Sequence, residues 1–154
     1  MGEWIPARCA THSPAMARKA VDMDASAHPD HALGAAGEAA AARWLLRRGW
    51  RILATGWRGG GGEIDIVAER RGIVAACEVK TRTSVDPHSP PLGHAQRDRL
   101  ARAAMAWAAR HPAFRQHVIR PDLIIVCPRG PGWDITRIED VTPDRYSNRV
   151  RSSP

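Results

Sequence analysis

The sequence predicts an α/β fold in which a mixed central sheet is flanked by helices. Two alanine-rich stretches, 33–49 and 94–111, have the composition and spacing of helices. Three short strand-like runs lie between them, and an apolar run at 120–127 follows the second stretch. Strands on both sides of a helix in chain order favour one sheet with helices packed on it. A length of 154 residues suits a single domain.

The first predicted helix is LGAAGEAAAARWLLRRG, from Leu33 to Gly49. Its alanines favour helix, and a glycine after a basic last turn is typical of a helix C-terminus. We therefore expect a helix of about four turns here.

The next segment predicts three consecutive strands. WRILATGWR is an apolar run that leads into the glycine cluster 59–62, which indicates a bend. EIDIVAE then alternates, and alternation separates the two faces of a strand. We expect one face to carry Glu63, Asp65 and Val67 and the other to carry Ile64, Ile66 and Ala68. RRG predicts a tight turn into IVAACEVK, so that 63–69 and 73–80 form a hairpin.

The second half begins with a proline-rich stretch, VDPHSPPLG at 85–93, which predicts a mobile surface loop and a candidate lid. The amphipathic helix at 94–111 then ends before Pro112. RPDLIIVC predicts a buried strand that starts at or after Asp122, because Pro121 cannot donate to a ladder. WDITRIE predicts an alternating edge strand.

The ends of the chain are predicted to be tails. We expect a flexible tail at 1–30, a folded domain at 31–142 and a C-terminal tail at 143–154. The first tail contains a CxxH…HxxH arrangement, which either reflects chance spacing or holds zinc. Its four residues are Cys9, His12, His28 and His31.

Charge and composition narrow the class of function. The formal net charge of +7 favours a polyanionic partner, with nucleic acid ahead of a membrane surface. A biased genome composition is the alternative explanation of the arginines. Three cysteines without a CxxC pair predict neither a disulfide framework nor a redox dithiol. No apolar run approaches the roughly 18 residues of a membrane span, so we expect a cytoplasmic protein without a membrane partner.

A cluster of charged residues on the predicted hairpin suggests chemistry. Glu78 and Lys80 are two residues apart on a strand and so share a face. A turn near Arg71 brings Asp65 about level with Glu78. Two neighbouring carboxylates repel each other unless a cation lies between them, and hard oxygen ligands suit Mg²⁺ or Mn²⁺. We therefore expect a metal held by Asp65, Glu78 and the Val79 carbonyl.

Lys80 would lie beside that metal, where it could orient or deprotonate a bound water or stabilise negative charge on a phosphate. Arginine is a poor substitute because it does not lose its proton near neutral pH. The alternative is that these charges form ordinary cross-strand ion pairs. Glycines before Glu63 permit close backbone approach to a ligand. Glu38 is either close to the metal or an acid that stabilises the N-terminal end of a helix.

These motifs carry a resemblance. The stretch from GAAGEAAAARW through GEIDIVA to EVKTRTS resembles the signature of the YraN family, bacterial proteins of largely uncharacterised role. The resemblance runs from about Leu33 to about Asp140, and the pairing of GEIDIVA with EVKTR is specific. It implies a restriction-endonuclease-like αβββαβ core that carries a PD-(D/E)XK nuclease site. By position, Asp65 and Glu78 are the two acids of the motif and Lys80 is its lysine. Glu38 matches the family's helical Gly-Glu pair, and Glu63 matches the Glu of its Gly-Glu-Ile-Asp segment.

The resemblance also implies an activity. Such sites use Mg²⁺ to cleave phosphodiesters, and similarity to junction resolvases implies branched or structured DNA and a homodimer. Family members usually have a lysine at the start of the second helix, where this chain has Gln96 or Arg97, so a phosphate contact there is changed. The side chains that we expect to contact phosphates are Arg58, Arg82, Arg97, Arg99 and Arg102.

Three functions are consistent with these observations. The leading one is a metal-dependent nuclease that hydrolyses phosphodiester bonds in DNA. The alternative is a non-catalytic nucleic-acid-binding or recombination-accessory module on the same fold, and a third is a basic surface that docks an acidic protein. Trp57, beside the glycine cluster, is a candidate for stacking on a base, whereas we expect Trp44 and Trp107 to pack in the core.

Overall fold

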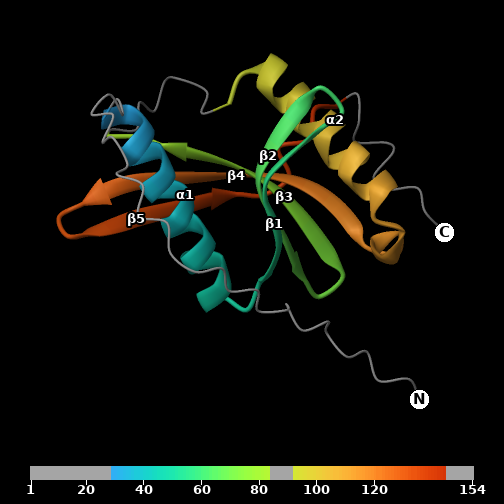
Figure 1. The fold of residues 1–154 in the computed structure, drawn as a ribbon, viewed down its shortest axis with the longest axis horizontal. Helices are drawn as coiled ribbons and strands as arrows, with labels where there is room; N and C mark the ends of the chain where they lie inside the picture. The colour runs from blue at the N-terminus through green and yellow to red at the C-terminus, as the bar shows by residue number, and fades with distance from the viewer. Residues whose placement is uncertain (1–28, 84–91, 145–154) are drawn as a thin grey trace, which may run out of the picture.

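A computed structural model describes residues 29–83 and 92–144 of the chain. These residues form two α-helices, one 3₁₀ turn and five strands (Figure 1). In chain order the elements are α1 (Pro29–Arg47), β1 (Arg51–Gly59), β2 (Gly62–Arg70), β3 (Ile73–Thr81), α2 (His94–Arg110), η1 (Pro112–Phe114), β4 (Val118–Arg129) and β5 (Gly132–Ile138).

The five strands form one mixed sheet, in the order β1-β2-β3-β4-β5. β3 and β4 run parallel, because α2 carries the chain back across the sheet between them, and every other neighbouring pair is antiparallel. The prediction of an α/β fold with a mixed sheet and flanking helices is confirmed. The element order is compatible with the αβββαβ core that the resemblance implies, with β5 added at the edge.

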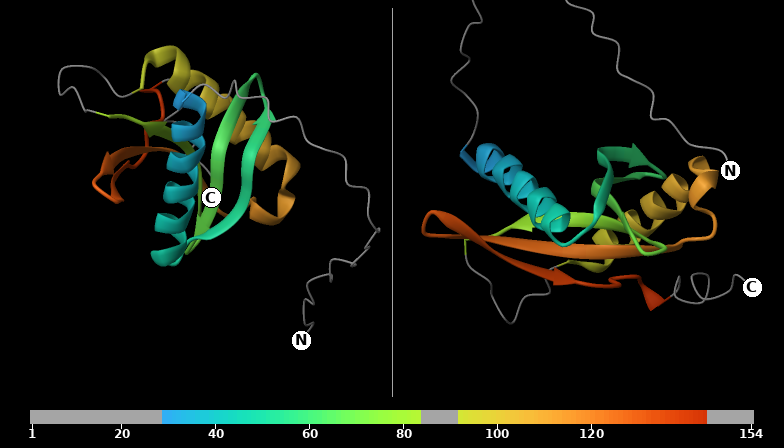
Figure 2. Two further views of the ribbon diagram at one scale, coloured as in Figure 1. Left: turned by 60° about the vertical axis from the view of Figure 1, so that its left-hand side comes forward. Right: turned by 90° about the horizontal axis from the view of Figure 1, so that it is seen from below.

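The helices cover opposite faces of the sheet, α1 in front of it and α2 behind it in the left panel of Figure 2. On the α2 side, Leu100 and Trp107 pack against Val74 and Leu123. On the α1 side, Leu45 belongs to a second buried cluster that includes Ala75, Cys77 and Ile124. β3 and β4 therefore contribute to both core clusters, as expected of central strands with a helix on each face.

The strands β1, β2 and β3 form a meander joined by two tight turns. Gly60 and Gly61 connect β1 to β2, and Arg71 and Gly72 connect β2 to β3, all four with positive φ between 52° and 80°. Two consecutive residues with positive φ are the pattern of type I′ hairpins, whose twist matches that of the strands. The predicted hairpin and its turn at Arg71 are therefore present.

Two predicted boundaries differ from the structure. α1 begins at Pro29 rather than Leu33. The prediction that the last buried strand starts at or after Asp122 is wrong, because β4 begins at Val118. Pro121 fits within the strand because its carbonyl faces away from β3 and accepts the Val141 N–H at 2.9 Å. The proline nitrogen lies on that same edge, where β5 has already ended, so no ladder bond is lost.

The predicted strict alternation of residues 63–69 is also wrong. Ile66 and Ala68 pack on the α1 side as a pair, but Ile64 packs on the α2 side together with Val67. The pairing of β2 with β3 ends at Ile66, beyond which β2 continues beside β1 alone. A strand with one neighbour is free to twist further, which carries Ile64 round to the other face.

Several predictions fall outside the residues that the structure describes. Most of the predicted tails 1–30 and 143–154 and most of the candidate lid at 85–93 are among them, because the structure does not describe residues 1–28, 84–91 and 145–154. Of the four residues in the CxxH…HxxH arrangement, only His31 is described, and it is exposed on α1. Among the described residues, no helix combines the length and the apolar character needed to cross a bilayer.

Candidate active site

The candidate site lies where β2 and β3 separate. We call this place the fork, and its residues are Asp65, Glu78, Val79 and Lys80. The pairing of the two strands ends at Ile66 and Cys77, and continuing that register would set Val79 opposite Ile64. Instead, the carboxylate of Asp65 reaches across the gap, and its Oδ2 accepts the Val79 N–H at 2.6 Å. A side chain thus replaces a ladder partner, and it fixes the Asp65 carboxylate against the backbone of β3.

Glu78 and Lys80 lie on β3 at the same place. Lys80 Nζ is 2.5 Å from Glu78 Oε1, and the two side chains are only 21% and 19% exposed. Val79 between them is buried in the α1-side core. The two charged side chains are therefore neighbours on one face of the strand, as the two-residue period predicts.

Burial makes Asp65 harder to ionise. Its pKa is raised from 3.8 to about 6, chiefly by desolvation. The negative charges of Glu78 and Glu38 raise the pKa further, whereas the Val79 N–H and the Lys80 ammonium lower it. A half-buried carboxylate with two acidic neighbours gains more than an exposed one from a bound cation.

Helix α1 contributes Glu38, an exposed side chain close enough to raise the Asp65 pKa. Its position depends on the residue before it. Gly37 is buried, and a Cβ at this position would overlap the Thr81 side chain at the end of β3. The absence of a side chain at Gly37 therefore lets α1 rest directly on β3, which brings Glu38 toward the fork. In the sequence, the signal of this contact is limited to the glycine before the acid.

The donors that the fork offers to a cation are oxygen atoms. Asp65 and Glu78 each use one carboxylate oxygen in the contacts described and have a second to offer. The Arg82 N–H donates to the Val126 carbonyl of β4, so the even-numbered residues of β3 direct their backbone N–H and C=O groups toward β4. The odd-numbered residues direct theirs the other way, and the Val79 carbonyl therefore lies on the same side as the Val79 N–H that Asp65 accepts. Oxygen donors with water suit Mg²⁺ or Mn²⁺. Among the described residues, no group of three or more His, Cys, Asp or Glu side chains is arranged to hold a metal.

The other predicted site residues lie around this fork rather than in it. Glu63 is on the β1–β2 hairpin, where it forms an exposed ion pair with Arg58 at 3.1 Å. Gln96 accepts the Gly93 N–H at 3.4 Å and so helps to close the first turn of α2. Arg97 donates to the Leu92 carbonyl at 3.3 Å.

Arg99 and Arg102 are exposed on α2. Their backbone carbonyls, however, explain two of the glycines in the β1–β2 turn. A Cβ on Gly60 would lie 2.6 Å from the Arg102 carbonyl oxygen, and one on Gly62 would lie 2.5 Å from that of Arg99. We expected these glycines to let a ligand approach the backbone closely, but the group that lies close to them is the backbone of α2.

The tryptophans follow the same packing logic. Trp107 is buried, 2% exposed, and Trp44 packs against the α1-side core, as predicted. Trp57 is half-buried against the α2-side core, with the Arg110 guanidinium 5.6 Å from the centre of its ring. Base stacking by Trp57 stays a prediction, and the observed partners of its ring are core residues and an arginine.

Comparison with known proteins identifies the family. The profile described as "Uncharacterised protein family UPF0102" matches residues 37–126. A UPF0102 protein of Bradyrhizobium sp. is 39% identical over 110 residues, which are 71% of this chain and 78% of the relative. One of Rhodopseudomonas palustris is 39% identical over 71% of this chain and 85% of the relative. One of Methylorubrum extorquens is 36% identical over 73% and 88%.

The chain belongs to the UPF0102 family. This family is the YraN family, so the resemblance seen in the sequence is confirmed. The matched region begins at Gly37, the glycine that rests on Thr81, and extends to Val126 within β4. It therefore includes α1 from Gly37 onward and the whole fork.

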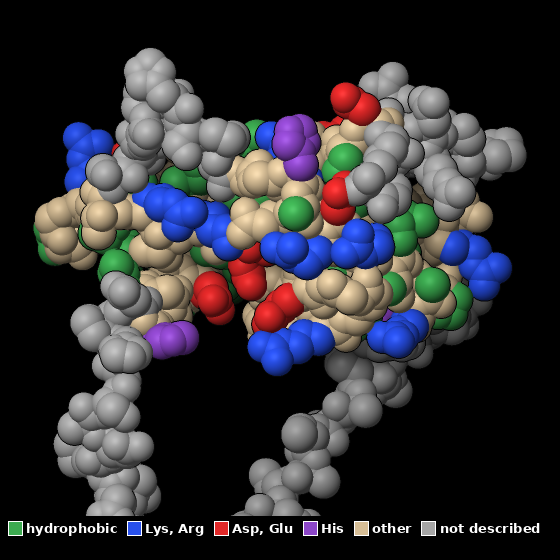
Figure 3. Space-filling model, turned by 90° about the horizontal axis from the view of Figure 1, so that it is seen from above, with side chains coloured by type: hydrophobic (Ala, Val, Ile, Leu, Met, Phe, Trp, Pro, Cys, Tyr) green, Lys and Arg blue, Asp and Glu red, His purple; other side chains and the backbone are tan. Residues whose placement is uncertain are grey.

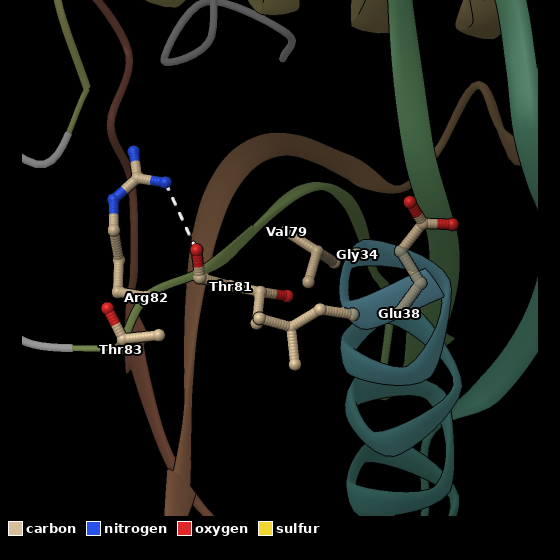
Figure 4. Close-up of a pocket in the computed structure, with 7 residues that line it drawn as sticks. Gly34, Glu38, Val79, Thr81, Arg82 and Thr83 are labelled. Atoms are coloured by element: carbon tan, nitrogen blue, oxygen red, sulfur yellow. Dashed lines mark hydrogen bonds between the residues drawn. The ribbon is translucent and has the colours of Figure 1, made fainter. Parts of the chain in front are cut away.

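The UPF0102 chain also has an open pocket that the sequence did not predict. It lies beside the fork, between the first turns of α1 and the end of β3, and has a volume of about 360 Å³. Glu38 is on the helical side of the pocket, while Arg82 and Thr83 are on the other side (Figure 4). The remaining lining residues are Leu33, Gly34, Val79 and Thr81. Because they come from segments about 45 residues apart, no local motif indicates the pocket.

Charges of both signs gather on one face of the UPF0102 molecule. Figure 3 shows acidic side chains near the middle of this face, with Lys and Arg side chains on either side of them. A cation would be attracted to the acidic centre and a polyanion to the basic surroundings.

A second charged cluster has a structural role. Asp122 is fully buried, and its carboxylate accepts hydrogen bonds from Arg120 at 2.9 Å and 3.2 Å and from Arg137 at 2.7 Å and 3.0 Å. It also accepts the Asp140 N–H at 2.9 Å. Arg137 in turn stacks on Trp50, 4.3 Å from the ring centre. These contacts join β4, β5 and the segment after β5.

Proposed function

We propose that this UPF0102 protein is a metal-dependent nuclease that hydrolyses phosphodiester bonds in DNA. The observation that carries the proposal is the fork itself, where Asp65, Glu78 and Lys80 meet on diverging strands. Two half-buried acids beside one ammonium group do not favour folding, because the free-energy cost of removing these charges from water can exceed the attraction between them. Such an arrangement is more common at functional sites.

Each residue of the fork has a role in this proposal. Asp65, Glu78 and the Val79 carbonyl hold Mg²⁺ or Mn²⁺, and Glu38 adds negative charge that favours the cation. The chemistry that the metal supplies when bound is polarisation of a phosphoryl oxygen and a lowered pKa of bound water. Lys80 orients the attacking water and stabilises negative charge that develops on the phosphate.

The net charge and the exposed arginines of the chain suit a polyanionic substrate. The chain carries a formal charge of +7, and Arg58, Arg82, Arg99 and Arg102 are exposed. Arginines that contact phosphates release counterions, which gives binding that does not depend on sequence. We further propose that the substrate is branched or structured DNA and that the protein acts in the cytoplasm as a homodimer.

The experiment that tests this function is cleavage of labelled single-stranded, duplex, flap and four-way-junction DNA with Mg²⁺, Mn²⁺ or EDTA. We expect metal-dependent cutting that falls by at least about 100-fold in both Asp65→Ala and Lys80→Ala. Asp134→Ala is the matched control, because Asp134 is an exposed acid on β5. Cutting that survives Lys80→Ala unchanged would contradict the proposal.

A binding module without catalysis is the competing function, and the exposed arginines of α2 favour it independently of the acids. It predicts salt-sensitive DNA binding that is the same with Mg²⁺ and with EDTA, no cutting of any substrate, and no effect of Asp65→Ala on binding. The same experiment therefore separates the two functions.

A further inference from the structure

We propose that the pocket between α1 and the end of β3 receives an unpaired nucleotide next to the phosphodiester bond that is cut. The pocket shares Glu38 and Val79 with the fork, so an occupant of it would lie on the α1 side of β3, close to the Val79 backbone that Asp65 contacts. This inference rests on the proposed nuclease function and extends it to the kind of DNA that is cut.

Size is the first argument. The pocket has a volume of about 360 Å³, within the range of sites that bind small ligands. That space is larger than one phosphate group needs and suits a single nucleotide. It does not suit a base pair, so a base must be unpaired to enter.

The lining is the second argument. Leu33 and Val79 offer apolar surface for a base, and Thr81 and Thr83 offer hydroxyl groups that can donate to or accept from its polar edge. Arg82 is exposed and donates one N–H to the Thr81 carbonyl at 3.1 Å, which holds its guanidinium at the rim of the pocket. A guanidinium there can stack on a base or pair with the adjoining phosphate.

The energetic consequence is a preference among substrates. A paired base must leave its stack before it enters a pocket, at a cost that an already unpaired base does not bear. Duplexes with a bulge, a flap or a mismatch at the cut site should therefore bind more tightly than fully paired duplexes.

The test compares binding to two labelled duplexes that differ by one unpaired thymidine, measured in EDTA so that no cutting occurs. We expect the unmutated protein to bind the bulged duplex at least about tenfold more tightly. Leu33→Trp fills the pocket and Arg82→Ala removes its cation, so both should lose this preference. The matched controls are Leu46→Trp, at the exposed end of the same helix, and Arg129→Ala, an exposed arginine at the end of β4, and both should keep it.

Thermal unfolding of Leu33→Trp beside Leu46→Trp checks that both variants fold, and Arg82→Ala tests the pocket without adding bulk. Equal affinity for the two duplexes would overturn the proposal. It would also be overturned by a preference that survives both pocket variants, or by equal binding when the unpaired thymidine is replaced by an abasic site.

Failure of this inference is distinguishable from failure of the nuclease function. Metal-dependent cutting that is equal for bulged and paired DNA would support the nuclease function and contradict nucleotide binding in the pocket. Preference for the bulge without cutting of any substrate would retain the pocket as a nucleotide-binding site and remove the nuclease.

Discussion

Gly37 of α1 lies directly against the side chain of Thr81 at the end of β3, with no room for a Cβ between them. This contact connects the helix that carries Glu38 to the strand that carries Glu78 and Lys80. It therefore sets the distance between the helical acid and the fork, although neither Gly37 nor Thr81 has ionisable chemistry of its own.

Gly37→Ala should push α1 away from β3. We expect a loss of about 1–3 kcal/mol in the free energy of unfolding, as for other overpacked sites, measured by urea unfolding. Gly34→Ala is the control, because a Cβ there meets nothing within 4 Å and alanine is the better helix former. Adding Thr81→Ala to Gly37→Ala removes the overlapping hydroxyl and should restore part of the loss. A Gly37→Ala variant as stable as Gly34→Ala would show that the helix is free to move.

Asp65 should make stability depend on pH in an unusual direction. Its pKa is raised by burial to about 6, so the folded state favours the protonated carboxyl. The resulting stabilisation is complete below the ordinary pKa of 3.8 and is lost as the pH rises through about 6.

Asparagine at position 65 stays neutral and can still accept the Val79 N–H. In EDTA, Asp65→Asn should therefore gain stability relative to the unmutated protein as the pH rises from about 4 to about 8. Urea unfolding across that range measures the difference, with Asp134→Asn, an exposed acid, as the control. A difference that stays constant with pH would mean that Asp65 ionises as easily in the folded chain as in the unfolded one.

The local part of the candidate site could be predicted from the sequence. The two-residue period places Glu78 and Lys80 on one face, and a tight turn at Arg71 brings Asp65 level with them. Both relationships depend on residues within one hairpin, where spacing and geometry are directly linked. The element order follows from the same local patterns.

The parts that could not be predicted depend on contacts between distant segments. Alternation alone did not show that β2 pairs with β3 only from Ile66 onward, because the divergence before Ile66 comes from sheet twist. Pro121 indicated that β4 starts at or after Asp122, because the sequence does not show that the Pro121 carbonyl and nitrogen face away from β3. Gly60 and Gly62 suggested a ligand, but their neighbour is the backbone of α2.

The exposed arginines of α2 should set the salt dependence of DNA binding. A lysine or arginine that contacts a phosphate adds about one unit to the slope of log affinity against log salt. We expect Arg99→Ala and Arg102→Ala each to reduce the slope by about that amount, measured in EDTA across a series of salt concentrations. Arg129→Ala removes the same charge from the end of β4 and should leave the slope unchanged. Equal slopes for all the variants would mean that Arg99 and Arg102 do not contact phosphates and that DNA binds elsewhere on the protein.

Asp122 should be the most sensitive acid for folding. Its removal leaves the Arg120 and Arg137 guanidinium groups without the buried carboxylate that accepts their hydrogen bonds. We expect Asp122→Ala to lower the free energy of unfolding by about 3–5 kcal/mol. Asp134→Ala breaks only an exposed pair and should cost about 1 kcal/mol or less. Similar losses in the two variants would mean that the buried cluster adds no more than a surface ion pair does.

Lys80→Arg separates two roles of the lysine at the fork. Arginine keeps the positive charge beside Glu78 and should preserve folding and DNA binding in EDTA. It spreads that charge over a planar group and does not release a proton near neutral pH. If Lys80 orients or deprotonates the attacking water, Lys80→Arg should cut DNA at least about 100-fold more slowly than the unmutated protein. Arg129→Lys, the reverse exchange at an exposed position, should cut at the normal rate. Full activity in Lys80→Arg would leave the lysine with an electrostatic role alone, because only its charge would then be needed.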